Sequence, residues 1–205
     1  EINRASPRTQ SALLEAMNEN QATIEGRRYP LTKPFMVIAT ENPIEFHGTY
    51  PLPEAQMDRF LVRLPMGYPA AEVEVDIIKS HAHNEPLDKI KPVLRLEQVR
   101  RIQEEVTEVH VDDSILEYIV EIVHATRHDN RLQLGISTRG TLMLSRAAKA
   151  RAYFQKHDFV IPDDVLWLVP YVLPHRVLLT PKTRHSSVTA REIVMDIVGR
   201  IKVPV

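Results

Sequence analysis

The stretch FMVIATENPIEFHGTYPLPEAQMDRF, residues 35–60, decides how this sequence folds. It opens with a run of mainly apolar and β-branched residues, 35–40, which breaks at Glu41-Asn42-Pro43. A short apolar run bounded by turn signals is typical of a strand buried on both faces of a parallel sheet. Polar side chains just past the carboxyl end of such a strand lie where open α/β sheets bind ligands. Asn42 is therefore the first candidate functional residue, and Arg59 is the second.

The composition of the 205 residues is that of an ordinary globular protein, with 43% hydrophobic and 26% charged residues. A formal net charge of −1 argues against a general binder of nucleic acid or of anionic membranes. The sequence contains no run of about 18 apolar residues, so no membrane span is predicted. The absence of cysteine excludes a disulfide framework and favours a cytoplasmic location. Because the sequence begins with Glu1 rather than Met, we expect that it starts within a longer protein.

The first third of the chain mixes helix and strand signals. Ser6 suits a helix N-cap, and Pro7 suits the first helical position. Gly26 can adopt positive φ in a hairpin turn. The pattern predicts, in order, a helix from residue 6 to residues 18–20, a hairpin over 21–32, the buried strand 35–40, a helical turn over 54–58 and a second apolar strand over 60–64.

From residue 70 onward the apolar spacing is helical. Helices are predicted over residues 70–81, 96–106, 112–128, 138–156, 162–171 and 187–199. Asp112-Asp113-Ser114 is expected to start the third of these, and Thr189 to cap the last. A polar link is expected over 127–135. The change of character near residue 68 predicts two domains, an α/β part over 1–68 and an all-helical part over 69–205.

Five short segments resemble, in order, motifs of the AAA+ ATPases of the MoxR type. They are EINRASP at 1–7, which follows the Walker B aspartate in that family; ATENP at 39–43, sensor 1; GTYPLPEAQMDRF at 48–60, the arginine-finger loop; GISTRG at 135–140, sensor 2; and DFVIPDDV at 158–165, the entry to a lid helix. The hairpin is similar to an insertion that precedes sensor 1. The resemblance covers essentially the whole chain. It implies part of a P-loop NTPase AAA+ α/β core followed by an all-α lid domain, mostly helical overall.

Two departures from the family pattern stand out. No G-x-x-x-x-G-K-[ST] phosphate loop is present, so we expect this chain alone to be inactive. Thr138 and Gly140 flank Arg139, where the family more often has Pro and Ala.

The resemblance implies a role for each matched polar residue. Glu1, the Walker B glutamate, would polarise the attacking water. Asn42, at sensor 1, would contact that water and the γ-phosphate through its amide. Arg59 would be an arginine finger that reaches the nucleotide of the next subunit, and Arg139, at sensor 2, would bind an ATP phosphate. Arg4 resembles a position near the subunit interface.

The residue patterns alone leave plainer alternatives open. Glu1 could be a solvated glutamate, and Asn42 a turn residue before proline. Arg59 could form a surface ion pair with Asp58 or Glu54. Arg139 could extend into solvent. A cation at the amino end of a helix opposes the helix dipole, however, and an anionic ligand would explain it.

Histidine pairs give a weaker signal. His81-x-His83 and His124-x-x-x-His128 have spacings that metal sites use. Neither pair has an obvious third ligand, so solvated or core histidines are the better interpretation, and no metal site is predicted from them.

Taken together, the resemblance implies an ATPase that uses ATP and Mg²⁺ at the interfaces of a ring homo-oligomer, a hexamer. Its expected function is chaperone-like remodelling of a protein client, or metal-cofactor insertion, with a von Willebrand factor type A protein as partner. One alternative is a helicase-like DNA-remodelling ATPase, for which the hairpin region offers Arg27, Arg28 and Lys33. Another is a non-catalytic interaction module whose unpaired sheet edge would pair with another chain.

Overall fold

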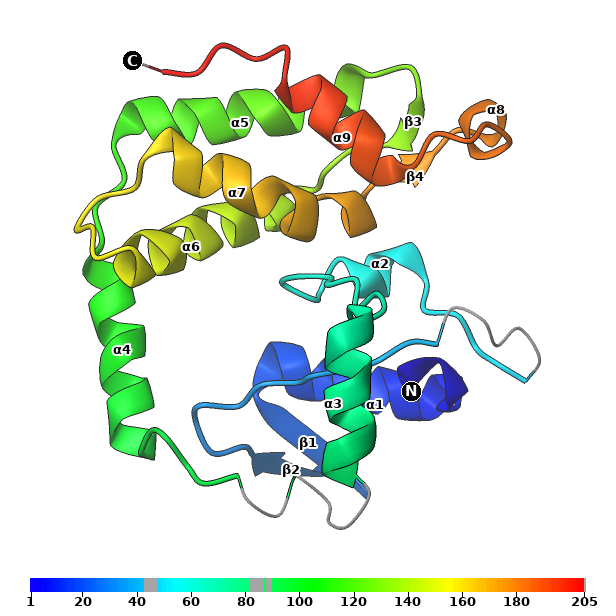
Figure 1. The fold of residues 1–205 in the computed structure, drawn as a ribbon, viewed down its shortest axis with the longest axis vertical. Helices are drawn as coiled ribbons and strands as arrows, with labels where there is room; N and C mark the ends of the chain where they lie inside the picture. The colour runs from blue at the N-terminus through cyan, green and yellow to red at the C-terminus, as the bar shows by residue number, and fades with distance from the viewer. Residues whose placement is uncertain (43–47, 82–86, 88–89, 205) are drawn as a thin grey trace.

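The computed structural model describes residues 1–42, 48–81, 87 and 90–204. Figure 1 shows their arrangement. The elements are η1 Ile2–Arg4, α1 Pro7–Glu19, β1 Gln21–Ile24, β2 Arg27–Pro30, α2 Glu54–Met57, α3 Ala71–His81, α4 Leu96–Glu108, α5 Asp113–His128, β3 Leu132–Leu134, α6 Thr138–Phe154, α7 Pro162–Val172, η3 Pro174–Arg176, β4 Leu178–Leu179, α8 Pro181–Arg184 and α9 Ala190–Val198.

Four long helices, α5, α6, α7 and α9, pack together with the β3–β4 pair and η3 (Figure 1). We call this assembly the helical lobe. The first helix, the hairpin and α3 lie on the other side of the molecule, and α4 runs along one flank between the two parts. The short helix α2 contacts η3, so the segment leading to Arg59 meets the helical lobe.

The predicted helices are confirmed, and the caps explain where they begin. Ser6, the residue before Pro7, accepts a hydrogen bond from the Thr9 amide. Asp112 accepts one from the Ser114 amide. Thr189 and Glu192 form a reciprocal capping box, so α9 begins at Ala190 rather than at the predicted residue 187.

The predicted hairpin is also confirmed. Strands β1 and β2 pair antiparallel from Gln21↔Pro30 to Ile24↔Arg27. The two turn residues have positive φ, 49° at Glu25 and 77° at Gly26. Two consecutive positive φ angles are those of a type I′ turn, whose twist matches the flanking strands.

The two apolar strands predicted at 35–40 and 60–64 are wrong. Within the described residues the only sheets are β1–β2 and β3–β4, so neither run has a neighbouring strand to pair with. Met36 and Ile38 are 76% and 82% exposed, whereas the prediction required burial on both faces. Each of the two runs forms a backbone hydrogen bond outside any sheet. The Thr40 carbonyl accepts from the Ile2 amide at 2.9 Å, and the Arg63 amide donates to the Tyr171 carbonyl at 2.9 Å.

The hydrophobic core lies in the helical lobe. Its largest cluster joins buried residues of α5, α6, α7 and α9 with their connections, from Val109 to Val198. The predicted inward positions Ile115, Ile119, Ile122 and Val123 all belong to it. Among the described residues of 1–68, the buried apolar side chains are Ile2, Leu14 and Ala16. The domain boundary at residue 68 stays a prediction.

The link over 127–135 contains a strand that the polar composition concealed. Leu132 and Leu134 of β3 pair with β4. Arg131 lies 2.6 Å from Asp129 and 2.6 Å from Asp196, which ties this link to α9. Hydrogen bonds from Arg131 lower the pKa of both carboxyl groups.

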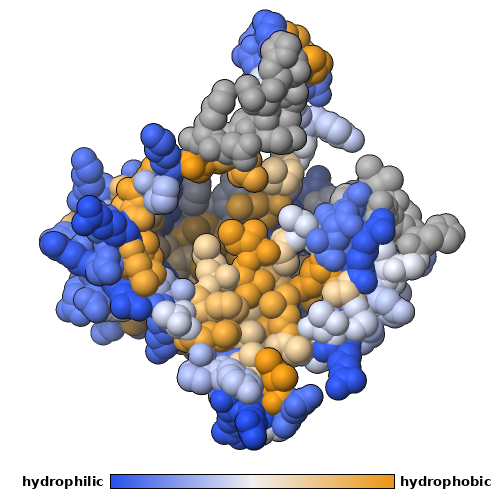
Figure 2. All heavy atoms as spheres, turned by 90° about the horizontal axis from the view of Figure 1, so that it is seen from below, coloured by the Kyte–Doolittle hydropathy of each residue, from blue (hydrophilic) through white to orange (hydrophobic). Residues whose placement is uncertain are grey.

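Large apolar side chains remain exposed between residues 35 and 78. The most exposed include Ile38, Leu64, Met66, Tyr68 and Ile78. Seen from below, apolar residues gather in the middle of one face, with hydrophilic residues on either side (Figure 2). Of the helices described, none is long and apolar enough to cross a membrane.

Candidate functional site

The first predicted site residue, Glu1, lies beside the segment that leads to Asn42. The Ile2 amide donates to the Thr40 carbonyl at 2.9 Å, which joins the two segments side by side. The Glu1 carboxylate forms a 2.7 Å ion pair with Arg4, and its side chain is 44% exposed. Asn42 is half-buried two residues beyond Thr40. Two segments that are distant in the sequence, one with Glu1 and one that leads to Asn42, are therefore joined side by side.

Gln10, which no sequence pattern singled out, holds this region together. Its side chain is 2% exposed. The Nε2 group donates to the carbonyl oxygens of Ile2, at 3.1 Å, and of Tyr50, at 2.8 Å. The Tyr50 amide in turn donates to the Asn3 carbonyl. One buried amide of α1 thus links the segment after Glu1 to the loop that leads to Arg59.

The turn that carries Arg59 follows α2. Arg59 is half-buried, and its Nε is buried without a hydrogen-bond partner among the described residues. The ion pair with Asp58, one of the alternatives for Arg59, is not what the structure shows. Asp58 instead pairs with Arg176, whose Nε lies 3.2 Å from Oδ1, and faces Arg139, whose Nη1 lies 4.0 Å from Oδ2.

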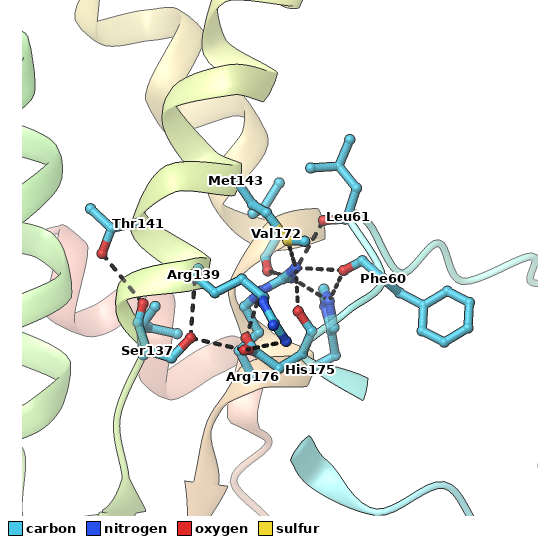
Figure 3. A network of polar contacts seen from close by, with 12 residues as sticks. Phe60, Leu61, Ser137, Arg139, Thr141, Met143, Val172, His175 and Arg176 are labelled. Carbon is cyan, nitrogen blue, oxygen red and sulfur yellow. Dashed lines mark hydrogen bonds and ion pairs between the residues drawn. The ribbon is translucent and has the colours of Figure 1, made fainter. Parts of the chain in front are cut away.

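Arg139 lies in the first turn of α6, at the amino end of a helix as its place in the sequence predicts. Ser137 caps this helix: its Oγ accepts from the Gly140 amide at 3.1 Å and donates to Oδ2 of Asp58 at 2.9 Å. Figure 3 shows Arg139 and Ser137 next to Arg176. The Arg139 side chain is 44% exposed. Its positive charge lies at the amino end of a helix, where the helix dipole repels a cation. Asp58 offsets part of that repulsion.

Arg176 is the residue at the centre of this network, and our sequence analysis missed it. Its side chain is fully buried. It donates to the backbone carbonyl oxygens of Asp58, Phe60 and Leu61 on one side and of Val172 on the other (Figure 3). The signal that could have revealed it is a charged residue within the apolar run VLPHRVLL, residues 172–179, because a buried charge requires partners.

Burial sets the charge states of this network. It lowers the pKa of Arg176 to about 10, although Asp58 opposes the shift, so Arg176 stays a cation at neutral pH. Burial, together with the neighbouring Arg176, lowers the pKa of His175 to about 4. His175 Nε2 lies 3.0 Å from the Phe60 carbonyl and also contacts Arg176. A neutral imidazole avoids placing a second cation against the guanidinium.

The glycine after Arg139 has a packing reason. A Cβ at Gly140 would lie 2.5 Å from Cγ2 of Ile136 and 3.0 Å from Cδ of Arg176. Any larger residue would require Ile136 or Arg176 to shift. The departure from the family's alanine at this position is therefore tied to the buried arginine.

The predicted residues fall into two groups. The segment of Glu1 lies beside the segment that leads to Asn42, and Arg139 faces Asp58, the residue before Arg59. A carboxylate, an amide and two guanidinium groups are the side chains that suit phosphate and an attacking water. A magnesium site is a different matter: no group of three potential metal ligands occurs in the described part of the chain. His83 lies outside the described residues.

Comparison with known proteins gives two family matches. Residues 1–62 match the family described as ATPases associated with various cellular activities, AAA, and residues 124–197 match the AAA lid domain.

Full-length relatives extend this likeness. The chain is 49% identical, over its whole length, to the YeaC protein of Bacillus subtilis and covers 64% of it. It is 38% identical to Chaperone MoxR1 of Mycobacterium tuberculosis, with 100% of this chain and 56% of that protein covered. A crystal structure of a Cytophaga hutchinsonii protein matches with a TM-score of 0.91 at 35% identity, covering 100% of this chain and 64% of that one. The chain thus spans less than two thirds of each of these proteins.

Proposed function

The chain belongs to the AAA+ ATPases of the MoxR type, and on this premise we propose that Glu1, Asn42, Arg59 and Arg139 serve ATP hydrolysis in a complete subunit. The observation that carries the proposal is the hydrogen bond from the Ile2 amide to the Thr40 carbonyl. It aligns the segment of Glu1 with the segment of Asn42, which are separated by about 40 positions in the sequence. Water activation and phosphate contact need these two side chains on one site.

Each residue has a distinct task in this proposal. The Glu1 carboxylate orients the attacking water and accepts its proton, and Arg4, at 2.7 Å, holds that carboxylate in place. The Asn42 amide donates toward the γ-phosphate side and accepts from the water. As in the family, ATP would supply the phosphoryl group, and Mg²⁺ would neutralise charge on the phosphates. The described residues do not form the metal's ligand set, so no step here is assigned to it.

The two arginines neutralise charge that develops on the phosphate. Arg139 acts on the nucleotide of its own subunit, from an exposed place at the start of α6. Arg59 acts on the nucleotide of the adjacent subunit, which requires a ring, and the family favours a hexamer. We also propose a chaperone-like role on a protein client, with a von Willebrand factor type A protein as partner. The likeness to Chaperone MoxR1 of Mycobacterium tuberculosis supports the chaperone-like role. A cytoplasmic location stays a prediction.

The proposal is tested in a complete subunit that carries this sequence, by measuring ATP turnover and nucleotide affinity. Glu1→Gln and Asn42→Ala should each lower turnover, by about 10²–10⁴-fold for the acid–base role of Glu1, and change nucleotide affinity only slightly. Matched controls are Glu19→Gln and Asn18→Ala, because both side chains are exposed at the end of α1. Wild-type turnover in Glu1→Gln would contradict the proposal.

A second measurement uses the 205-residue chain itself. It contains no phosphate-loop pattern, so we propose that it hydrolyses ATP negligibly. Turnover by the purified chain at the rate of a complete subunit, lost on Glu1→Gln substitution, would show that the dependence on a phosphate loop is wrong.

A further inference from the structure

Arg176 donates hydrogen bonds to backbone carbonyl oxygens on both sides of Arg59. Its Nη2 donates to the carbonyl oxygens of Asp58, at 3.4 Å, and of Phe60, and its Nη1 donates to that of Leu61, at 3.4 Å. Its charge is paired with the Asp58 carboxylate at 3.2 Å. A planar fork with five donors can hold several acceptors at once, which a lysine cannot do in the same geometry.

The other end of this side chain is fixed in the helical lobe. Arg176 belongs to η3, donates to the Val172 carbonyl at the end of α7, and lies 2.7 Å from the sulfur of Met143 in α6. Two further contacts join the same parts of the molecule: the Arg63 amide donates to Tyr171, and His175 meets the Phe60 carbonyl. The turn of Arg59 is thus docked on the lobe of its own chain.

The Asp58 carboxylate connects this junction to Arg139. It pairs with Arg176 at 3.2 Å and accepts from Ser137 at 2.9 Å, whereas Arg139 is its distant, half-exposed partner at 4.0 Å. If a phosphate draws Arg139 away, Asp58 keeps its two closer partners. The junction can therefore stay closed while Arg139 binds an anion.

We propose that Arg176 is a positioning residue that fixes the turn of Arg59 to the helical lobe, so that the two move as one body. The inference rests on the proposed role of Arg59 in the neighbouring site. It goes further in one respect. The subunit's own nucleotide would bias the orientation of the helical lobe through Arg139, and that orientation would place Arg59 in the site of the next subunit. Coupling of this kind needs a rigid connection between the two sites, and Arg176 supplies it.

Subunit mixing in a ring of complete subunits tests the inference. Arg176→Met subunits should keep a sound site of their own but offer a misplaced finger, with turnover reduced by about 10–100-fold in the homogeneous ring. Glu1→Gln subunits lack water activation but keep the finger, so a ring that mixes them with Arg176→Met subunits should regain activity at about one interface in four. Ring interfaces are heterologous, and each joins the nucleotide site of one subunit to the finger of the next. Only an Arg176→Met site that faces a Glu1→Gln finger is complete. Arg176→Met subunits mixed with Arg59→Ala subunits should regain nothing, because both lack a working finger.

The opposite pattern would overturn the inference. Rescue by Arg59→Ala but not by Glu1→Gln would place the defect of Arg176→Met in its own nucleotide site, and rescue by both or by neither would show a defect of another kind. Mixing Arg59→Ala with Glu1→Gln is the separate test of the proposed function. If that pair fails to complement, the trans role of Arg59 falls, and the inference falls with it.

Two additional variants guard against a folding defect. Arg176→Lys keeps the charge and most of the apolar stem but loses the planar fork. It should show the same complementation pattern with a smaller loss of turnover. If Arg176→Met does not fold, Arg176→Lys decides the question. Arg131→Met is the matched control, because it removes another ion-paired arginine of the same lobe that lies on Asp129 and Asp196. Its turnover should stay within about twofold of the wild-type rate.

Discussion

Asp58 and Arg176 are separated by 118 positions in the sequence, yet Nε of the arginine lies 3.2 Å from Oδ1 of the aspartate. The arginine side chain has no exposed surface, and that of the aspartate is 17% exposed. The pair meets as a close ion contact without a hydrogen bond between these two atoms, while the guanidinium's donors point to backbone carbonyls. This contact joins the part of the chain that contains Arg59 to the helical lobe.

Breaking the pair should destabilise the chain strongly. Arg176→Met removes the closest cation from the mostly buried Asp58, which keeps Ser137 at 2.9 Å and the more distant Arg139 at 4.0 Å. Asp58→Asn leaves the buried Arg176 without its carboxylate partner. Each variant should lower the free energy of unfolding by about 3–5 kcal/mol. The double variant should lose less than the sum. Urea unfolding followed by fluorescence of Trp167, the single tryptophan, measures this. Arg101→Met removes an exposed ion pair with Glu105 and should change nothing measurable, and an additive double variant would contradict the coupling.

Gly140→Ala should destabilise the chain although alanine is the better helix former. Its Cβ would come within 2.5 Å of Ile136 and 3.0 Å of Arg176, so either the core or the ion pair must shift, at about 1–3 kcal/mol. Gly199→Ala is the control, because that residue has φ −62° and its Cβ would meet nothing closer than 3.4 Å. The thermal midpoint should fall for the first variant and hold or rise for the second. Equal midpoints would rule out the close approach.

Stability should fall as the pH drops from about 6.5 toward 4. Burial lowers the pKa of His175 to about 4 in the folded chain, against 6.5 when unfolded, so within that window the unfolded state binds one more proton. The free energy of unfolding should therefore decrease by up to about 1.4 kcal/mol per pH unit on acidification. Unfolding curves collected across the window should be flatter for His175→Gln. His185→Gln, at an exposed position, should leave the wild-type slope, and an unchanged slope in His175→Gln would refute the prediction.

Arg139→Ala should separate activity from stability. Its side chain is 44% exposed and 4.0 Å from its carboxylate partner, so stability should change by less than about 1 kcal/mol. In a complete subunit, however, the loss of a phosphate contact should weaken nucleotide binding by about tenfold, as expected for a charge-assisted hydrogen bond. Titration with a fluorescent ATP analogue measures the affinity. Arg146→Ala, exposed farther along α6, should bind as the wild type does; equal affinity in both variants would exclude Arg139 from the site.

How far the sequence predicted these features depended on whether the signal was local. The spacing of Ile115, Ile119 and Ile122 identified α5, because all the packing information for one face of a helix lies within a few turns. The turn at Glu25-Gly26 was equally local. Residues 35–40 carried the composition of a buried strand, but a strand in the interior of a sheet needs a partner on each side, and apolar composition does not supply one.

The site divided in the same way. Glu1, Asn42, Arg59 and Arg139 could be chosen because each lies in a short motif. Their roles stay predictions. Gln10 and Arg176 could not be chosen, since what makes them important is burial among carbonyl oxygens of distant segments. A buried polar group is recognised by its partners, which only the folded chain reveals.

The uneven distribution of the core has a consequence for how the chain unfolds. Nearly all buried apolar side chains lie between residues 109 and 198, whereas 1–68 contributes Ile2, Leu14 and Ala16 among those described. We therefore expect unfolding in two steps rather than one, with the amides of α1 and the hairpin exchanging with solvent long before those of α5 or α7. The amide of Arg63, held by Tyr171, should exchange with the slow group. The turn beside Arg59 would then share the cooperativity of the lobe and not that of its own sequence neighbours.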